Sequence, residues 1–446
     1  MTQSVSPVEI IGAGLAGCEA ALVLARKGIP VELVEMRPVK TTPAHKTALP
    51  AELVCSNSLK SRELPGAQAL LKDELTRLNS PLLALAADTA VPAGSALAVD
   101  RLKFSNSVAQ ALAAQPLITQ TVREAIAPAG NGRITLIAAG PLASDALVLW
   151  LTGRFTTESL NFYDAIAPIV SLDSIDTSIA FYASRWKEDN TDYLNCPFTE
   201  EEYRRFYDAL VAADVTVARD FEQARFFEAC LPVEVIASRG YQSLSFGPLK
   251  PVGFVDPRTN RRPYAVCQLR RETNDGDSFS MVAFQTRLTI PGQQQVLRLI
   301  PGLEHAQFLR YGSCHRNSFM NSPELLNAHL SFKDEPTLFL SGQLCGNEGY
   351  SESIATGHLA ALFIAARISG TDISIPPPTT ACGALLRHIT ASEQKPFSPS
   401  SFNFGLVPAL DGGQRRKIGK KDRHALLCER AQADFAVWKN DNNVVC

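Results

Sequence analysis

Apolar and polar residues follow one another at the start of the chain in the order of a strand, a helix and a second strand. Val8, Ile10 and Ile11 form a short apolar run, and residues 29–34 form another. Between these runs, residues 18–27 space alanine and leucine so that one face of a helix can cover a sheet. The pattern predicts a β-α-β unit at the front of the chain.

A glycine-rich turn joins the first strand to this helix. Its residues are Gly12, Ala13, Gly14, Leu15, Ala16 and Gly17. In a dinucleotide site the first glycine allows the tight turn, the second lets backbone N–H groups approach a pyrophosphate, and the third permits close helix–strand packing. The helix N-terminus adds partial positive charge for the phosphates. These six residues are therefore predicted to bind a dinucleotide, with a glycine-rich turn of another α/β protein as the alternative.

Glu35 closes the second strand, about 20 residues after the glycines, where an acidic side chain can accept hydrogen bonds from ribose hydroxyls. With no arginine expected beside it, Glu35 favours FAD or NAD over NADP.

Two later strands indicate which of these cofactors, FAD or NAD, the chain binds. One, within residues 133–139, ends at Gly140; the other, within 337–341, ends at Gly342 and Gln343 and leads past Tyr350 into a helix over 351–367. Strand–glycine returns this far along the chain are typical of an interrupted FAD-binding domain. Gly140, Gly342, Gln343 and Tyr350 are thus further cofactor-binding candidates. The Tyr350 ring is expected to stack on the flavin or on a pterin, with core packing as the alternative.

The middle of the chain has a different pattern. A helix is predicted at 199–213 and strands at 246–256, 263–272 and 280–290, with a hairpin turn at 274–277. The predicted fold is α/β: a Rossmann-like FAD-binding domain in two parts, 1–160 and 315–446, interrupted by a smaller α+β insertion domain at 161–314. A basic tail follows a triple proline at 376–378.

The amino-acid composition excludes few classes of function. The chain has 446 residues, 46% apolar and 20% charged, with a net charge of −2, which fits a globular protein and neither favours nor excludes a nucleic-acid partner. Its ten cysteines form no Cys-x-x-Cys pair, so no metal site and no disulfide framework is expected. With no signal peptide and no long apolar stretch, the chain is expected in the cytoplasm, away from membranes.

Two of these cysteines, Cys55 and Cys230, lie in segments of small and apolar residues: 52–59 and 227–234. A thiolate is a strong nucleophile that can add to an electron-poor ring carbon and leave again. The alternative for any single cysteine is core packing, since most buried cysteines act as small hydrophobic residues.

Ordered motifs along nearly the whole chain resemble one family, the folate- and FAD-dependent tRNA (uracil-C5-)-methyltransferases, which are related to the larger Gid-type wobble-uridine enzymes. The motifs are residues 42–45, 51–59, 227–234, 246–253, 256–259, 262–266, 284–288, 298–303, 311–312, 315–317, 349–350, 385–390 and 403–405. The chain departs from the family pattern at Ala229, at 313–314, at 344–345 and at Asn347.

The resemblance implies methylation of the T-loop uridine of tRNA at C5. It implies 5,10-methylenetetrahydrofolate as carbon donor, FAD as carbon carrier and hydride source, and NAD(P)H as reductant. Such chemistry needs a thiolate on C6 and a base for the C5 proton. Cys230 is expected to be the nucleophile and Cys55 the base, and the reverse order stays open. The implied partner is tRNA, and no stable protein partner is implied.

Basic side chains in the insertion and the tail are candidates for phosphate contacts, with a solvated basic face as the alternative. They are Lys250, Arg258, Arg261, Arg262, Arg270, Arg271, Arg415, Arg416, Lys417, Lys420, Lys421 and Arg423. His315, Arg316 and Arg287 could meet a phosphate or the folate glutamate, or serve the structure. Rival hypotheses are the same chemistry on ribosomal RNA, a flavin oxidoreductase that does not act on RNA, a Gid-type enzyme and a non-catalytic RNA-binding scaffold.

Overall fold

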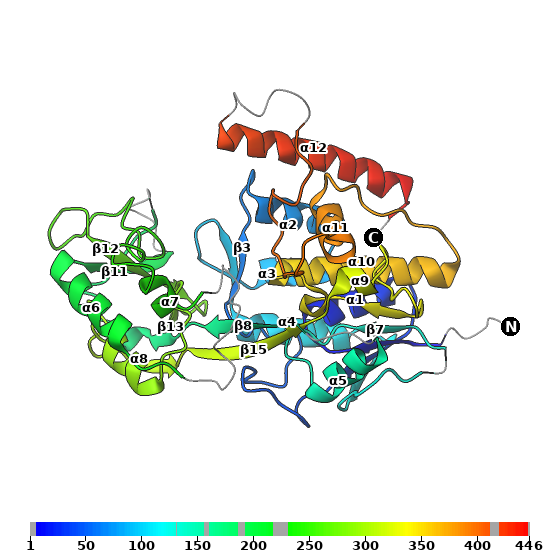
Figure 1. Ribbon diagram of the computed structural model, residues 1–446, viewed down its shortest axis with the longest axis horizontal. Coiled ribbons are helices and arrows are strands. Elements are labelled where there is room, and N and C mark those ends of the chain that lie inside the picture. The colour runs from blue at the N-terminus through cyan, green and yellow to red at the C-terminus, as the bar shows by residue number, and fades with distance from the viewer. Residues whose placement is uncertain are drawn as a thin grey trace.

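The computed structural model describes residues 6–130, 132–155, 160–185, 192–216, 231–410 and 419–444. Figure 1 shows two lobes connected by the strands β8 (Leu160–Ile166) and β15 (Ser313–Phe319). These strands pair antiparallel along their whole length, from Ile166 with Ser313 to Leu160 with Phe319. The chain therefore enters and leaves the smaller lobe through one two-stranded ribbon.

A five-stranded parallel sheet forms the centre of the larger lobe. In spatial order its strands are β16 (Leu338–Leu340), β7 (Thr135–Ile137), β1 (Val8–Ile11), β2 (Val31–Glu35) and β6 (Ile118–Val122). Helices α1 (Leu15–Arg26) and α10 (Tyr350–Ser369) pack against each other. Their backbones approach so closely that a Cβ on Gly357 would lie 2.3 Å from the Ala16 carbonyl oxygen. The predicted β-α-β unit and both later strands are confirmed.

Further elements surround this sheet. They are β3 (Ser58–Ser61), β4 (Ala90–Val91), β5 (Ala96–Val99), α2 (Ala67–Arg77), α3 (Pro81–Asp88), α4 (Arg101–Ala113), α5 (Asp145–Arg154), α9 (Ser322–Leu325), η4 (Gln343–Cys345), α11 (Ala381–Ala391) and α12 (Lys420–Asp441). Helix α5 begins at a capped position, where the Ser144 side chain accepts from the Leu147 amide. Helix α12, red in Figure 1, lies on the outside of the larger lobe.

The smaller lobe is built on a six-stranded antiparallel sheet. Its strands are β10 (Phe181–Tyr182), β11 (Tyr193–Phe198), β12 (Ala265–Arg271), β13 (Ser278–Met281), β9 (Ile169–Ser171) and β14 (Phe308–Arg310), with η1 (Leu172–Ser174) and helices α6 (Glu200–Ala212), α7 (Val233–Ala237) and α8 (Ile290–Leu297). The predicted helix α6 begins with a capping box, in which Thr199 and Glu202 satisfy each other's backbone amides. The predicted hairpin between β12 and β13 is also confirmed.

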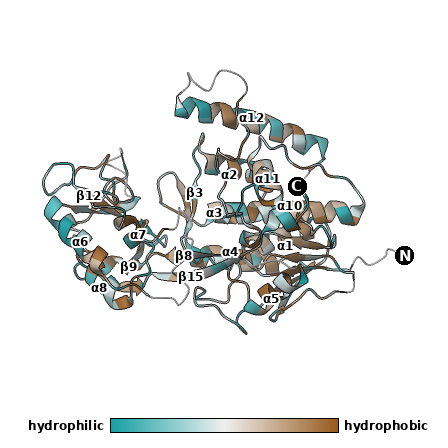
Figure 2. Ribbon diagram, viewed as in Figure 1, coloured by the Kyte–Doolittle hydropathy of each residue, from teal (hydrophilic) through white to brown (hydrophobic). Residues whose placement is uncertain are grey.

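Each lobe has its own hydrophobic core. One core draws on residues between Val8 and Leu151 and again between Met320 and Val444; the other lies between Val170 and Ala306. Figure 2 shows apolar residues on the strands and on the helix faces that cover them. The fold is thus α/β, with a Rossmann-like part that an antiparallel lobe interrupts. The predicted boundaries at 160/161 and 314/315 fall within the ribbon and stay predictions.

Two predicted strands are wrong. Residues 246–256 form turns, because Gly247, Pro248, Pro251 and Gly253 break the apolar run and the bonded backbone N–H groups reach carbonyls only three to five residues away. The strand expected at 280–290 ends at Met281. Ala283 then takes a φ of 59°, which turns the chain out of the sheet before α8. In the described part of the chain, no helix is long and apolar enough to cross a membrane.

Candidate active site

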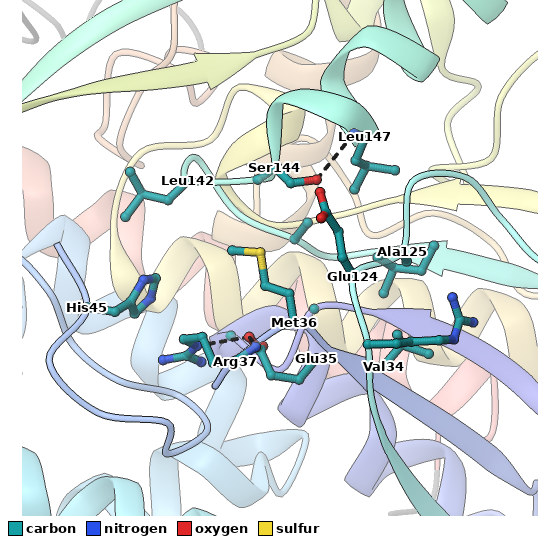
Figure 3. A pocket seen from close by; sticks show the side chains of 16 residues that line it. Val34, Glu35, Met36, Arg37, His45, Glu124, Ala125, Leu142, Ser144 and Leu147 are labelled. Carbon is teal, nitrogen blue, oxygen red and sulfur yellow. Dashed lines mark hydrogen bonds and ion pairs between the residues drawn. The ribbon is translucent and has the colours of Figure 1, made fainter. Parts of the chain in front are cut away.

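The first cavity, which we call the nucleotide pocket, lies at the carboxyl ends of β1, β2 and β7 (Figure 3). It measures about 510 Å³. Its walls include Gly12, Gly14, Val34, Glu35, Met36, Arg37, His45, Arg123, Glu124, Ala139, Leu142 and Ser144. This is the edge of a parallel sheet at which dinucleotides bind.

The glycine turn beside this pocket fits a bound pyrophosphate. Gly12 has a φ of +106°, and a Cβ on it would lie 2.6 Å from the Ala139 backbone. Gly17 packs against the same turn, since its Cβ would lie 1.9 Å from the Gly12 carbonyl oxygen. Gly14, by contrast, is not crowded, since a Cβ on it would lie 3.9 Å from the Ala138 carbonyl oxygen, and as N-cap of α1 it gives the helix no side-chain cap. The N-terminus of α1 is therefore left without a side-chain cap beside the pocket that Gly14 lines, as an anion site requires.

Glu35 lies on the pocket wall, as predicted, but it has an arginine beside it. Arg37 Nε donates to Glu35 Oε1 at 2.9 Å (Figure 3). The Ala13 amide donates to Glu35 Oε2 at 2.9 Å. Although burial opposes ionisation, the bonds from Arg37 keep the pKa of Glu35 below its usual value. The expectation of no nearby arginine is wrong. Arg37 is buried and also pairs with Glu52 at 3.3 Å, so both its neighbours are carboxylates.

The second cavity, which we call the cysteine pocket, measures about 1030 Å³. It collects residues from both lobes and from the ribbon between them. Its walls are Ala44, Val54, Cys55, Ser56, Ser58, Lys60, Pro141, Leu142, Ile166, Arg270, Gln285, His315, Asn317, Gln343, Glu348, Gly349 and Tyr350. Leu142 lines both cavities, so the two are neighbours. Three predicted site residues, Cys55, Gln343 and Tyr350, meet here from distant parts of the sequence.

Cys55 and Tyr350 are in direct contact. The Tyr350 hydroxyl lies 3.0 Å from Cys55 Sγ and accepts from the Cys55 amide at 3.0 Å and the Ser56 amide at 3.2 Å. Burial and the nearby sulfur raise the pKa of Tyr350 well above its usual value, so the phenol keeps its proton. Because two amides occupy the oxygen's lone pairs, the phenol proton is left to donate to sulfur. Tyr350 and Gly349, at the start of α10, both line this pocket.

Three arginines hold the segment that carries Cys55. Arg101 donates to the Leu53 carbonyl at 2.6 Å, and Arg310 donates to the Val54 carbonyl at 3.2 Å. Arg270, from β12, donates to Ser56 Oγ at 3.1 Å. Burial and the positive charge of Arg101 lower the pKa of Arg310 to about 10.

One carboxylate balances this cluster. Glu272 pairs with Arg101 across the lobes at 2.6 Å, and the side chains are only 6% and 16% exposed. Burial would raise the pKa of Glu272, yet Arg101 keeps it below its usual value. Of this cluster only Arg270 was singled out in the sequence, as a candidate for phosphate contacts.

The other predicted residues take varied positions. The His315 ring nitrogen Nε2 lies 2.9 Å from Ser313 Oγ, and burial lowers the pKa of His315, so the ring is neutral at pH 7. The Gln343 amide donates to the Glu348 carboxylate. Gly342 lies directly before Gln343, and a Cβ on Gly342 would lie 3.1 Å from the Ala16 side chain. Gly140 directly follows Ala139, which lines the nucleotide pocket. Arg287 supports the structure, since its amide and guanidinium bind Glu234.

Cys230 lies outside the described residues, and so do Ala229, Arg415, Arg416 and Lys417. The described chain resumes at Leu231, and the Val233 amide donates to the carbonyl of Gln285, a residue of the cysteine pocket. In the described residues, no group of three histidine, cysteine or acidic side chains is placed to hold a metal ion. Among the described cysteines, Cys55 and Cys314 are half-buried and all the others are buried.

The basic candidates divide by exposure. Arg270 lines the cysteine pocket and Arg271 stacks over Tyr182, so both are half-buried, whereas Arg258 is exposed although it binds Asp256 at 3.0 Å. The remaining described candidates are exposed: Lys250, Arg261, Arg262, Lys420, Lys421 and Arg423.

The parallel sheet, its glycine turn and the interrupting lobe define the chain as a Rossmann-like flavoprotein. The family model described as "Glucose inhibited division protein A" matches residues 7–372. A Geobacter sulfurreducens protein named "Methylenetetrahydrofolate--tRNA-(uracil-5-)-methyltransferase TrmFO" is 51% identical over 97% of this chain and 98% of its own length. A Heliobacterium modesticaldum protein of the same name is 50% identical over 98% and 99%. The chain therefore belongs to the TrmFO family, within the wider GidA group.

A solved structure supports the fold assignment. Aquifex aeolicus GidA, in its form II crystal, superposes with a TM-score of 0.71 over 99% of this chain and 74% of that one, at 15% identity.

Proposed function

We propose that this protein methylates C5 of the T-loop uridine of tRNA, with 5,10-methylenetetrahydrofolate as the carbon donor. The observation that carries this proposal is the position of Cys55, half-buried in a pocket beside the nucleotide pocket, in a chain about half identical to named TrmFO proteins. A reactive thiol next to a flavin site is what folate-dependent methylation of a pyrimidine requires. We place this activity in the cytoplasm.

The two thiols divide the chemistry between them. A thiolate adds to C6 of the uracil, and the electron pair of the C5–C6 double bond makes C5 nucleophilic. After C5 takes up the one-carbon unit, a base removes the C5 proton and the thiolate leaves. We assign Cys230 as the nucleophile and Cys55 as the base, with the reverse order as the alternative.

The surroundings of Cys55 support a reactive sulfur. The Tyr350 phenol is placed to donate to it at 3.0 Å, and three arginines bind the backbone or side chains of the same segment. Positive charge and hydrogen-bond donors stabilise a thiolate relative to a thiol. Tyr350 also offers its ring to the pocket, where it can stack on the flavin or on the folate pterin.

FAD fits the nucleotide pocket. The uncapped N-terminus of α1 at Gly14 suits the pyrophosphate, and the Glu35 carboxylate lies on the wall where a ribose would bind. When bound, FAD would carry the one-carbon unit and supply the hydride, with NAD(P)H as the reductant. Gly12 to Gly17, Gly140, Gly342, Gln343 and Tyr350 would contact it.

The exposed basic side chains, from Lys250 to Arg262 on one lobe and from Lys420 to Arg423 on the other, would bind tRNA phosphates. The target uridine must leave its stack to reach the pocket. A uridine of ribosomal RNA could meet the same chemistry, so the substrate must be tested directly.

The test uses the purified protein, identified as a flavoprotein by its absorbance. We would incubate it with NAD(P)H, methylenetetrahydrofolate labelled in the transferred carbon, and either unmodified tRNA or ribosomal RNA. Label at C5 of the T-loop uridine is expected. Label in ribosomal RNA alone would contradict the tRNA assignment, and label in neither RNA would contradict the methyltransferase.

A further inference from the structure

Arg270 belongs to the smaller lobe but is attached to the segment that carries Cys55. Its Nε donates to Asn57 Oδ1 at 2.8 Å, and its Nη2 donates to Ser56 Oγ at 3.1 Å. Asn57 is fully buried, and its own amide donates to the carbonyls of Val99 and Arg271. The guanidinium plane is therefore fixed relative to Cys55 by two bonds to the next two residues of the chain.

The third guanidinium nitrogen of Arg270 is uncommitted. Within the described part of the chain, Nη1 has no hydrogen bond, although Arg270 forms part of the wall of the cysteine pocket. Burial lowers the pKa of Arg270, which marks a site with little water around the charge. The Glu272 carboxylate, whose charge acts on Arg270, is bound at two points by Arg101. A fixed, charged donor in such a site binds an anionic oxygen strongly.

We propose that Arg270 is a catalytic residue that binds the pyrimidine carbonyl oxygen on which negative charge develops when a thiolate adds to C6. This inference rests on the proposed function and holds for either order of the two cysteines. It assigns Arg270 a role different from that of the exposed arginines on the same lobe.

The electrons of this step balance without a further reactant. As the sulfur–C6 bond forms, the C5–C6 double-bond pair moves to C4–C5, and the C4–O double-bond pair moves to O4. The enolate oxygen accepts a hydrogen bond from Arg270, which keeps its proton. When C5 bonds to the one-carbon unit, the C4–O double bond forms again and the charge leaves the oxygen. Arg270 thus stabilises a charge that is absent from the bound substrate.

A phosphate contact fits Arg270 less well. Arg261 and Arg262 are exposed, as a residue that meets the RNA backbone must be, whereas Arg270 lies within a pocket wall beside a candidate catalytic thiol. The pocket wall is reached by a base that has left its stack, and the backbone stays outside.

Single-turnover kinetics with the FAD-loaded enzyme tests this assignment. The substrate is an unmodified tRNA transcript with tritium at C5 of uridine, and tritium release measures the reaction in the presence of methylenetetrahydrofolate and NAD(P)H. Arg270→Gln is expected to lower the rate at saturating tRNA by about 100-fold or more, the usual loss for one oxyanion donor. Its tRNA Kd and bound FAD should stay within about 3-fold of wild type. Arg270→Lys should recover part of the rate.

Arg262→Gln is the matched comparison, because it removes an exposed arginine from the same lobe and should raise the tRNA Kd while the rate at saturation is kept. A wild-type rate in Arg270→Gln would overturn the assignment. A defect confined to tRNA affinity, or loss of FAD from both Arg270 variants, would overturn it as well. If the wild-type enzyme itself releases no tritium, the proposed function fails, which is a separate result.

Discussion

The nucleotide pocket and the cysteine pocket adjoin each other, yet they are assembled differently. The first comes mostly from residues 11–37 and 123–147 of one lobe. The second needs the segment around Cys55, the ribbon, strand β12 of the other lobe and the start of α10. A site made within one lobe can form as that lobe folds. A site made between lobes depends on the contacts that hold them together, here the arginine cluster and Glu272.

The largest expected effect separates chemistry from cofactor binding. Cys55→Ser should lower methyl transfer by about 1,000-fold or more while FAD stays bound, because serine cannot supply the thiolate. Cys314→Ser changes a half-buried cysteine outside both pockets and should keep the activity. Methyl transfer at the wild-type rate in Cys55→Ser would remove Cys55 from the mechanism.

FAD binding in the nucleotide pocket can be weakened without a change in the stability of the fold. Gly14→Val should weaken FAD binding by about 100-fold, which corresponds to about 3 kcal/mol, because the side chain would fill space beside the uncapped N-terminus of α1. Its unfolding temperature without FAD should change little, because its φ of −78° suits valine. Gly17→Val should instead lower that temperature, since its Cβ has no room. Flavin titration and thermal unfolding measure the two effects. Unchanged FAD affinity in Gly14→Val would place the pyrophosphate elsewhere.

The ion pair between Glu272 and Arg101 joins the two lobes, and removing Glu272 should lower the free energy of unfolding more than removing Arg101. Glu272→Gln leaves the buried arginines without their carboxylate and should lower the free energy of unfolding by about 3 kcal/mol. Arg101→Gln should cost less, since Arg270 and Arg310 still face Glu272. Denaturant unfolding measures both, with Glu200→Gln of the exposed pair to Arg204 as a control of about 0.5 kcal/mol or less. Equal losses in the two variants would show that charge balance does not govern the cluster.

The smallest effect concerns pH and the wall of the nucleotide pocket. Burial, together with Arg37, lowers the pKa of His45 from 6.5 to about 4. His45 is thus neutral in the folded chain, and its contribution to stability is full above pH 6.5 and is lost as the pH falls toward 4. The loss is at most about 3 kcal/mol, and less for a partly hydrated ring. Unfolding of the FAD-free protein between pH 7.5 and 5 should therefore be less pH-dependent in His45→Gln. An identical pH dependence would exclude His45 as the source.

The same contrast explains what the sequence could predict. The glycine turn, β1, α1 and Glu35 follow each other within one local unit, so spacing alone indicated their arrangement. Arg37 was missed although it stands two residues from Glu35, because an ion pair depends on side-chain direction. Arg101, Arg270 and Arg310 bind the segment around Cys55 across as many as 256 positions of the sequence, as between Arg310 and Val54. The periodicity of apolar residues does not predict contacts between such distant side chains. The apolar run at 246–256 misled because its glycines and prolines outweigh strand propensity.

The ribbon of β8 and β15 has a consequence for how such proteins can be remodelled. Because Ile166 pairs with Ser313, the two ends of the smaller lobe are direct neighbours. A short turn in place of residues 167–312 would convert the ribbon into a simple hairpin, and a different domain with adjacent ends could be grafted at the same junction. Such a graft would keep every residue that lines the nucleotide pocket, whereas the cysteine pocket would lose Arg270 and Gln285, so the smaller lobe could be exchanged without loss of the flavin site but not without loss of the proposed chemistry.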